Sequence, residues 1–105
     1  MNWLGRITLL LGTSGLVAGE PPVPRRHLVE IRGMAFHPAV LEVARGDTVA
    51  WTNRDIVGHT ATARSGWDTG VIAQGAQAVI VSRSRGEFRY ICTLHPTMLG
   101  TLITR

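Results

Sequence analysis

The sequence predicts an all-β fold, a two-layer sandwich of seven or eight short strands. No long stretch repeats its apolar residues at the spacing of a helix, and short runs that alternate apolar and polar residues follow one another along the chain. Clusters of Gly, Pro, Asn and Asp, which favour turns, separate these runs. Short strands at such regular spacing are typical of a sandwich.

The individual strands follow from the alternation, because every second side chain of a strand lies on the same face. Val29 and Ile31 share a face in the first run, and Val49 and Trp51 share one in the third. In chain order, the expected strands are residues 28–32, 40–43, 48–52, 59–63, 78–82, 87–92 and 101–104.

The sixth expected strand ends at the single cysteine of the chain. Within residues 87–92, the side chains of Phe88, Tyr90 and Cys92 lie on one face. Cys92 therefore leaves the strand on the side of the aromatic rings. We expect its thiol at one end of the core.

The chain is expected to begin with a signal peptide at residues 1–19. A short start with one Arg precedes an apolar run, and the small residues Val17, Ala18 and Gly19 follow where a signal peptidase would cut. A retained membrane anchor is the alternative, but the apolar run is shorter than the ~20 residues that a span requires. A Pro-rich leader, residues 20–27, then enters a single domain, residues 28–105.

The charge and the cysteine content narrow the functional classes. The basic residues are all arginines, 11 against 7 acids, and they are scattered along the sequence without interleaved aromatics. This pattern favours ordinary solubility charge and argues against a nucleic-acid partner, although it could steer an acidic partner. One cysteine excludes an internal disulfide, so an exported chain carries a free thiol unless the thiol binds something.

Three side chains with metal-binding atoms follow one another at three-residue intervals, in the segment that ends the sixth expected strand and leads into the last. Cys92, His95 and Met98 supply a thiolate, an imidazole and a thioether. A loop this tight can wrap all three around one ion. Pro96 stiffens the loop, and Gly100 is expected to let the chain turn back into the last strand.

The fourth ligand is expected from another part of the chain. His59 opens a strand directly after the loop at residues 53–58, and in a sandwich this strand can lie beside the one that ends at Cys92. His27 adjoins the leader and His37 precedes a proline in a turn, so a solvated or structural role is expected for both. The candidate ligands are therefore His59, Cys92, His95 and Met98.

This ligand set favours one copper ion as the cofactor. Two imidazoles and a thiolate with a weak axial thioether form a copper electron-transfer site, whereas zinc rarely binds methionine. Soft sulfur suits Cu(I) and nitrogen suits Cu(II), so a site between these preferences changes oxidation state with little rearrangement.

Five segments of the chain carry a family resemblance. They are residues 34–38 (MAFHP), 43–53 (VARGDTVAWTN), the pair His59-Thr60, residues 86–92 (GEFRYIC) and the ligand loop 92–98. Through these segments the chain resembles, over residues 28–105, the cupredoxins of the plastocyanin and amicyanin group. The two-residue gaps around His95, together with Pro96, are the short form seen in amicyanins.

The resemblance implies a Greek-key sandwich with copper near one end, and an electron carrier rather than an enzyme, cycling between Cu(II) and Cu(I). It also implies that His95 reaches the surface through an apolar patch bordered by Leu94, Pro96 and Leu99. A redox partner, such as a c-type cytochrome, a dehydrogenase or an oxidase, would dock on this patch. A monomer in the periplasm or another exported space is expected, with membrane contact only if the signal is retained.

One position departs from the family pattern. Many relatives carry Asn directly after the first histidine ligand, where it ties that strand to the copper loop, but this chain has Thr60. A hydroxyl can make the corresponding bond to the loop around Thr93, although its reach is shorter.

Three other classes of protein fit part of the pattern. An immunoglobulin-like module fits the strand count, but its disulfide needs two cysteines. A cysteine hydrolase could use Cys92 with a histidine base, yet a small sandwich leaves little room for a substrate cleft. A periplasmic copper carrier that delivers the ion to another protein has the same ligands and stays open. Trp67 could lie in the core or contact a partner.

Overall fold

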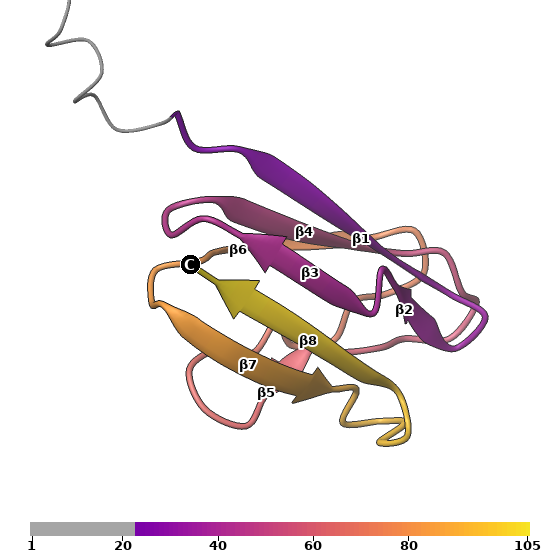
Figure 1. Cartoon of the computed structure of the whole chain (residues 1–105). Helices are drawn as coiled ribbons and strands as arrows, with labels where there is room; N and C mark the ends of the chain where they lie inside the picture. Colours follow the sequence, from indigo (N-terminus) through magenta and orange to yellow (C-terminus); the bar gives the residue numbers. More distant parts are fainter. Residues whose placement is uncertain (1–22) are drawn as a thin grey trace, which may run out of the picture.

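Eight strands in two sheets form the part of the chain that the computed structural model describes, residues 23–105 (Figure 1). The strands are β1 (Arg26–Arg32), β2 (Ala35–His37), β3 (Val40–Val43), β4 (Thr48–Asn53), β5 (Thr62–Ala63), β6 (Gln77–Val81), β7 (Gly86–Ile91) and β8 (Leu99–Thr104). The signal expected at residues 1–19 and the first residues of the leader lie outside the described residues. Within residues 23–105 no helix is long and apolar enough to cross a bilayer.

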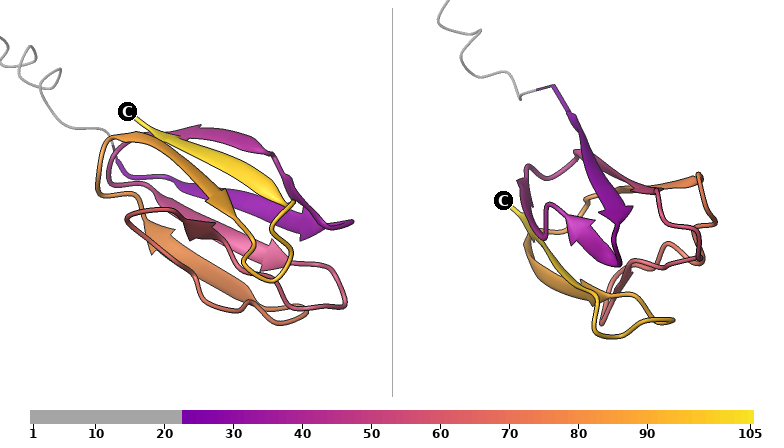
Figure 2. Two further views of the ribbon diagram at one scale, coloured as in Figure 1. Left: turned by 90° about the horizontal axis from the view of Figure 1, so that it is seen from below. Right: turned by 90° about the vertical axis from the view of Figure 1, so that its right-hand side faces the viewer.

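The two sheets form the layers of a sandwich (Figure 2). The first has the strand order β2-β1-β4-β6 and the second the order β3-β8-β7-β5, so the chain passes repeatedly from one layer to the other. β1 runs parallel to β4 and β3 parallel to β8, while the other neighbours are antiparallel. The predicted all-β sandwich is confirmed.

The beginning of the first sheet differs from the sequence prediction at two places. β1 begins at Arg26, because Arg26 and His27, which were expected in the leader 20–27, pair with β4. β2 was not expected. Gly33 and Met34 both adopt positive φ, 58° and 61°, and so close a two-residue hairpin turn between β1 and β2.

The strand expected at residues 59–63 is shorter than predicted. β5 comprises only Thr62–Ala63, and it pairs with β7 as anticipated. His59 instead forms an isolated bridge with Ile72, and the Thr60 amide donates to a sulfur atom rather than to a neighbouring strand. The pairing with β7 therefore does not extend to residues 59 and 60, which lie at the candidate site.

Aromatic rings fill the core between the layers. The rings of Trp51 and Tyr90 meet edge to face, 5.6 Å between centroids, and the Trp51 Nε1–H donates to the Tyr90 hydroxyl at 3.3 Å. Phe36 and Trp67 pack on the same tyrosine at 4.7 and 5.3 Å. Trp67 therefore packs against the core. Burial raises the pKa of Tyr90 to about 12, against the lowering effect of the bond from Trp51.

A buried carboxylate, Asp47, holds the turn before β4. It accepts hydrogen bonds from the Arg25 amide at 2.9 Å, from the His27 ring at 2.8 Å and from the Ala44 amide at 3.1 Å. These bonds lower the pKa of Asp47 from 3.8 to about 2, and the bond from the Arg25 amide has the largest effect. The carboxylate stabilises the fold only while it is ionised.

The contribution of Asp47 to stability is expected to disappear in acid. Because the folded pKa lies below the unfolded one, the stabilisation is complete above about pH 4 and is lost as the pH falls toward about 2. Urea unfolding of the wild type and of Asp47→Asn, followed by tryptophan fluorescence, should give midpoints that differ at neutral pH and converge over this range. Midpoints whose difference does not change with pH would contradict the assignment.

Candidate metal centre

The loop between β7 and β8 folds into two successive turns. The His95 amide donates to the Cys92 carbonyl at 3.2 Å, and the Met98 amide donates to the His95 carbonyl at 2.9 Å. A third bond, from the Cys92 amide to the Met98 carbonyl at 3.3 Å, closes the loop at its base. Residues that are three apart in the sequence are thereby held close together at one end of the sandwich.

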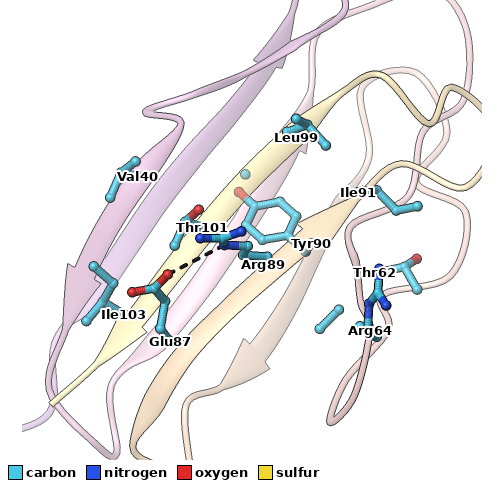
Figure 3. A pocket seen from close by; sticks show the side chains of 12 residues that line it. Val40, Thr62, Arg64, Glu87, Arg89, Tyr90, Ile91, Leu99, Thr101 and Ile103 are labelled. Carbon is cyan, nitrogen blue, oxygen red and sulfur yellow. Dashed lines mark ion pairs between the residues drawn. The ribbon is translucent and has the colours of Figure 1, made fainter.

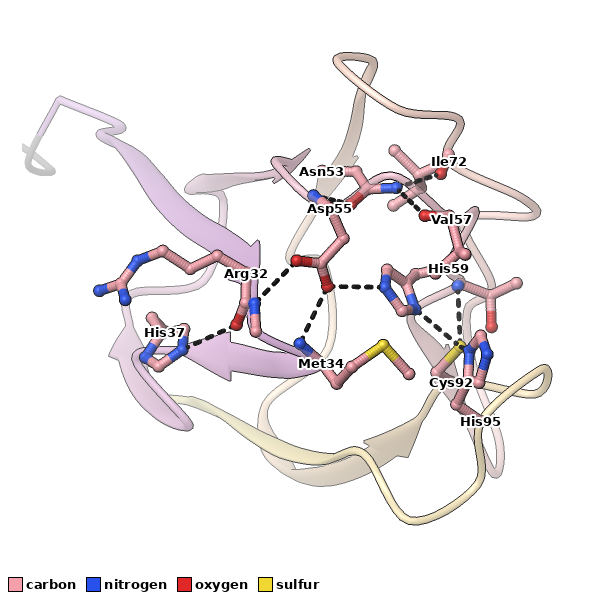
Figure 4. Close-up of polar contacts among 12 residues, drawn as sticks. Arg32, Met34, His37, Asn53, Asp55, Val57, His59, Ile72, Cys92 and His95 are labelled. Carbon is pink, nitrogen blue, oxygen red and sulfur yellow. Dashed lines mark hydrogen bonds and ion pairs between the residues drawn. The ribbon is translucent and has the colours of Figure 1, made fainter.

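Three of the four predicted ligand atoms meet at this end (Figure 4). Cys92 Sγ lies 3.6 Å from His59 Nδ1 and 3.8 Å from His95 Nδ1, and all three atoms lie within 4.8 Å of one another. His59 and Cys92 are fully buried, whereas His95 is half-buried. The two imidazole rings meet edge to face, with centroids 5.0 Å apart. Small movements of the side chains would let one ion bind all three atoms.

Met98, the fourth predicted ligand, lies next to this group. Its side chain is buried in the same apolar cluster as Cys92, and its carbonyl accepts the hydrogen bond from the Cys92 amide. Its role as an axial ligand stays a prediction.

Thr60 connects the His59 segment to the ligand loop. Its amide donates to Cys92 Sγ at 3.3 Å, and its hydroxyl accepts a hydrogen bond from the Thr93 amide at 2.9 Å. The hydroxyls of Thr60 and Thr93 also lie 3.2 Å apart, and the Thr62 hydroxyl donates to that of Thr60 at 2.9 Å. The expected hydroxyl bond to the loop around Thr93 is confirmed.

Asp55 holds the ring of His59 from the other side (Figure 4). Its carboxylate lies 2.9 Å from His59 Nε2 and also accepts hydrogen bonds from the amides of Gly33, at 2.7 Å, and Met34, at 2.9 Å. Because a carboxylate accepts hydrogen bonds, Nε2 carries the proton and Nδ1 is left free on the side of the thiol. The β1–β2 turn and the ring of His59 are thus held by one carboxylate.

The sequence interpretation missed Asp55, which was placed only in a turn before His59. A carboxylate four residues before a candidate ligand histidine was the available signal. Burial raises the pKa of Asp55, but the bonds from Met34, His59 and Gly33 together outweigh this effect, and the pKa lies below its usual value. Asn53 supports the same loop, because its side-chain amide donates to two carbonyls and its Oδ1 accepts the Asp55 amide at 2.9 Å.

Replacing Asp55 by Asn is expected to weaken both the fold and metal binding. The amide group of Asn must turn its NH₂ toward at least one of the three donors, which costs about 2 kcal/mol of unfolding free energy for the unpaired N–H. A freed His59 ring should lower the affinity for copper about 10- to 100-fold. Denaturant unfolding of the metal-free protein measures the first effect, and competition with a copper chelator measures the second.

Asp68→Asn is the matched control for Asp55. Asp68 is also a loop carboxylate with local hydrogen bonds, but its partners are Thr62 and Gly70 rather than a histidine. Copper affinity should change in Asp55→Asn alone. Equal affinities in the two variants would remove Asp55 from the support of His59.

The other two histidines lie outside this group. His27 Nε2 lies 2.8 Å from the Asp47 carboxylate, and His37 Nε2 lies 3.1 Å from the Arg32 carbonyl. Each ring therefore has a hydrogen-bond partner of the kind that the expected structural role requires.

Exposed apolar side chains surround the candidate metal centre. Leu94 and Leu99 are 52% and 64% exposed, and Pro96 between them is exposed as well. Further exposed apolar side chains lie in segments that contact His59 or Asp55. We call this whole set the apolar rim: Met34, Ile56, Val57, Val71, Leu94, Pro96 and Leu99.

A separate groove of about 840 Å³ lies on the outer face of the second sheet (Figure 3). Val40, Leu99 and Ile103 line it, together with the ion pair of Glu87 and Arg89, whose Oε2 and Nε are 3.6 Å apart. None of the candidate ligands lines this groove. It is therefore not part of the metal centre.

The donor atoms fit copper better than other common ions. Two imidazole nitrogens and one cysteine sulfur meet around a single point, with a buried thioether next in the loop. Calcium and magnesium prefer oxygen ligands, and structural zinc sites use four cysteine or histidine ligands. A mixed nitrogen and sulfur set with one methionine is the set that electron-transfer copper uses.

Comparison with known proteins gave concordant matches. The family profile described as Cupredoxin-like domain matches residues 7–104. The Cu(I) form of a point mutant of amicyanin is 26% identical, with 84% of this chain and 89% of that chain covered and a TM-score of 0.73. An oxidized amicyanin mutant is also 26% identical, with 76% and 82% covered and a TM-score of 0.72.

A copper enzyme is among the similar structures. The Cu-containing nitrite reductase from Thermus scotoductus SA-01 is 29% identical, with a TM-score of 0.71, over 82% of this chain and 23% of that chain. The likeness therefore covers a minor part of that enzyme. No curated protein sequence matched.

Proposed function

The chain belongs to the cupredoxin-like family, and from this premise we propose that it is a type 1 copper protein that carries single electrons between redox partners. The observation that carries the proposal is the approach of His59 Nδ1, Cys92 Sγ and His95 Nδ1 to within 4.8 Å of one another at one end of the sandwich. The likeness to amicyanin, solved in Cu(I) and oxidized forms, supports it.

The proposed copper ligands are His59, Cys92, His95 and Met98. Bound copper supplies a one-electron couple between Cu(II) and Cu(I). The chain holds the donor atoms in place beforehand: the Asp55 carboxylate orients the ring of His59, and the Thr60 amide donates to the sulfur of Cys92. A site held in this way changes little between oxidation states, which favours fast electron transfer.

His95 is the proposed route for the electron. It is the one member of the ligand set that reaches the surface, since the other three are buried. The apolar rim around it offers a docking surface without charges that must be desolvated. A redox protein such as a c-type cytochrome, a dehydrogenase or an oxidase would dock there, close to Leu94, Pro96 and Leu99.

We also propose that the protein works outside the cytoplasm as a monomer. Residues 1–19 would direct export, residues 20–25 would act as a leader, and residues 26–105, which begin with β1, would form the working domain. A periplasm or an equivalent exported space supplies the soluble redox partners that such a carrier needs.

Visible and electron paramagnetic resonance spectra, recorded while Cu(II) is added to the metal-free protein, test the function. An intense visible band that saturates at one copper per chain is expected, together with a resonance of small copper hyperfine splitting. Repeated reduction and oxidation in the presence of a Cu(I) chelator should leave the copper bound. Loss of copper at the first reduction would instead favour copper delivery.

Met98→Leu is expected to keep copper and to change the redox potential. Leucine has a similar volume, so packing is conserved, but the weak thioether contact is lost. A thioether that stabilises one oxidation state over the other by about 1.4 kcal/mol changes the potential of a one-electron couple by about 59 mV. Voltammetry measures this shift. The control is Met34→Leu on the apolar rim, and equal potentials in both variants would remove Met98 from the site.

A further inference from the structure

Five arginines that are far apart in the sequence gather at the end of the sandwich opposite the candidate metal centre. β1 and β4 begin at this end, and β3, β6 and β8 finish there, as Figure 1 shows for the start of β1 and the C-terminus. The Arg45 amide donates to the Arg105 carbonyl at 3.0 Å, and the Thr48 amide donates to the Arg25 carbonyl at 2.9 Å. We call this end the basic pole and define it by the exposed residues Arg25, Arg45, Arg83, Arg85 and Arg105.

Most of the positive charge of the basic pole is not neutralised by the residues that the structure describes. The three carboxylates near this end are already paired, because Glu42 lies beside Arg105, Asp47 beside His27 and Glu87 beside Arg89. Within residues 23–105, none of the other four arginines of the pole takes part in an ion pair. Four guanidinium groups are therefore available to an external anion.

The basic pole lacks the apolar centre that a protein-docking surface normally has. Among residues 23–105, only Val23 and Val81 of the exposed large apolar side chains adjoin it, whereas the apolar rim lies at the other end. Protein interfaces are anchored by aromatic or aliphatic side chains. Anionic lipid headgroups, in contrast, attract arginine through charge alone, by about fivefold in binding for each residue.

We propose that the basic pole docks on the surface of an anionic lipid bilayer, so that the candidate metal centre points away from the lipid. The chain enters the sandwich at this pole, since residues 1–22 precede Val23 and Arg25. The arginines of the basic pole are the same whether residues 1–19 are removed or retained. The protein is thereby kept at a membrane with its apolar rim open to redox partners.

Binding to vesicles tests the orientation. The protein is recovered from an exporting host, its N-terminus is read by mass spectrometry, and it is spun down with vesicles of phosphatidylcholine, pure or with one third phosphatidylglycerol. Binding is expected only with phosphatidylglycerol, and it should weaken as salt rises from about 10 mM to about 150 mM and the Debye length falls from about 30 Å to about 8 Å.

A pair of triple variants with the same net charge separates the basic pole from total charge. Replacing Arg45, Arg83 and Arg85 by Gln should lower binding about 100-fold. The control replaces three arginines that are not among the five of the pole and are paired with Glu30 or Glu87, namely Arg32, Arg54 and Arg89. The control should bind within a few-fold of the wild type.

Three outcomes would overturn the proposal. These are equal losses in both triple variants, equal binding to neutral vesicles, and no binding to anionic vesicles at low salt. Metal-free and copper-loaded protein should bind equally, since the basic pole contains none of the proposed ligands. A failed vesicle assay would thus leave the proposed electron-transfer function untouched.

Discussion

Replacing Cys92 with serine is expected to abolish the intense visible band of the copper-loaded protein. That band requires charge transfer from a thiolate sulfur to Cu(II), and the serine hydroxyl stays protonated at neutral pH. Serine is close to cysteine in size and can still accept the hydrogen bond that the Thr60 amide donates to Cys92 Sγ. The loss is therefore one of chemistry, and it is measured by absorption during titration with Cu(II).

The Cys92→Ser experiment has controls for the fold and for the choice of residue. The metal-free variant should unfold within about 1 kcal/mol of the wild type, because the side chain is nearly conserved in volume. His37→Gln changes a histidine that bonds the Arg32 carbonyl outside the cluster, and it should leave the band intact. A strong band that survives in Cys92→Ser would refute the assignment of the thiolate.

The layers of the fold could be predicted because the pattern of apolar residues records which face of each strand is buried. Val29, Ile31, Val49 and Trp51 were placed on inner faces by alternation alone, and all four are buried. β2 could not be predicted, since it depends on Met34 adopting a φ of 61° that a methionine rarely takes. Alternation reports burial but carries no information on such a turn.

In the candidate site, too, contacts between residues close in the sequence could be predicted, and contacts between distant residues could not. The spacing of Cys92, His95 and Met98 is local, and two turns of the loop follow directly from it. The support of His59 by Asp55 is not local, because the carboxylate is held by amides of the β1–β2 turn more than twenty residues earlier. Sequence spacing cannot show a contact that only the parallel pairing of β1 with β4 creates.

The arginines illustrate the same limit. Scattered along the chain, they indicated ordinary solubility charge. In the sandwich, strand ends that lie far apart in the sequence meet at the basic pole. Arg25, Arg45 and Arg105 line one depression there. Arginines that are scattered along the sequence thus lie together at one end of the folded domain.

Gly100→Ala is expected to destabilise the protein by about 3 kcal/mol or more, since overpacking of a close-packed core costs about 1 to 3 kcal/mol in ordinary cases. Gly100 was expected to let the chain turn after the ligand loop. It lies instead inside β8, directly opposite Tyr90 of β7. A Cβ at this position would lie 2.5 Å from the Tyr90 hydroxyl and 2.6 Å from its Cε1, so the glycine makes room for the ring.

The tyrosine cannot easily give way to this Cβ. Phe36 and Trp67 pack on its ring, and Trp51 both packs on it and donates a hydrogen bond to its hydroxyl. For a domain of this size the cost corresponds to a fall in Tm of about 12 °C or more. Thermal unfolding of the metal-free protein, followed by circular dichroism, measures it.

Two further variants decide whether the ring of Tyr90 is the cause. Gly58→Ala is the matched control, because its Cβ would meet only the Val71 Cγ1 at 3.1 Å and a backbone carbonyl at 3.8 Å, and the exposed valine can move. It should cost less than about 1 kcal/mol. In a Tyr90→Leu background, Gly100→Ala should lose most of its effect, since the two changes are coupled through direct contact. If the alanine costs as much beside leucine as beside tyrosine, the ring is not the obstacle, and the glycine must be required for the backbone of β8 itself.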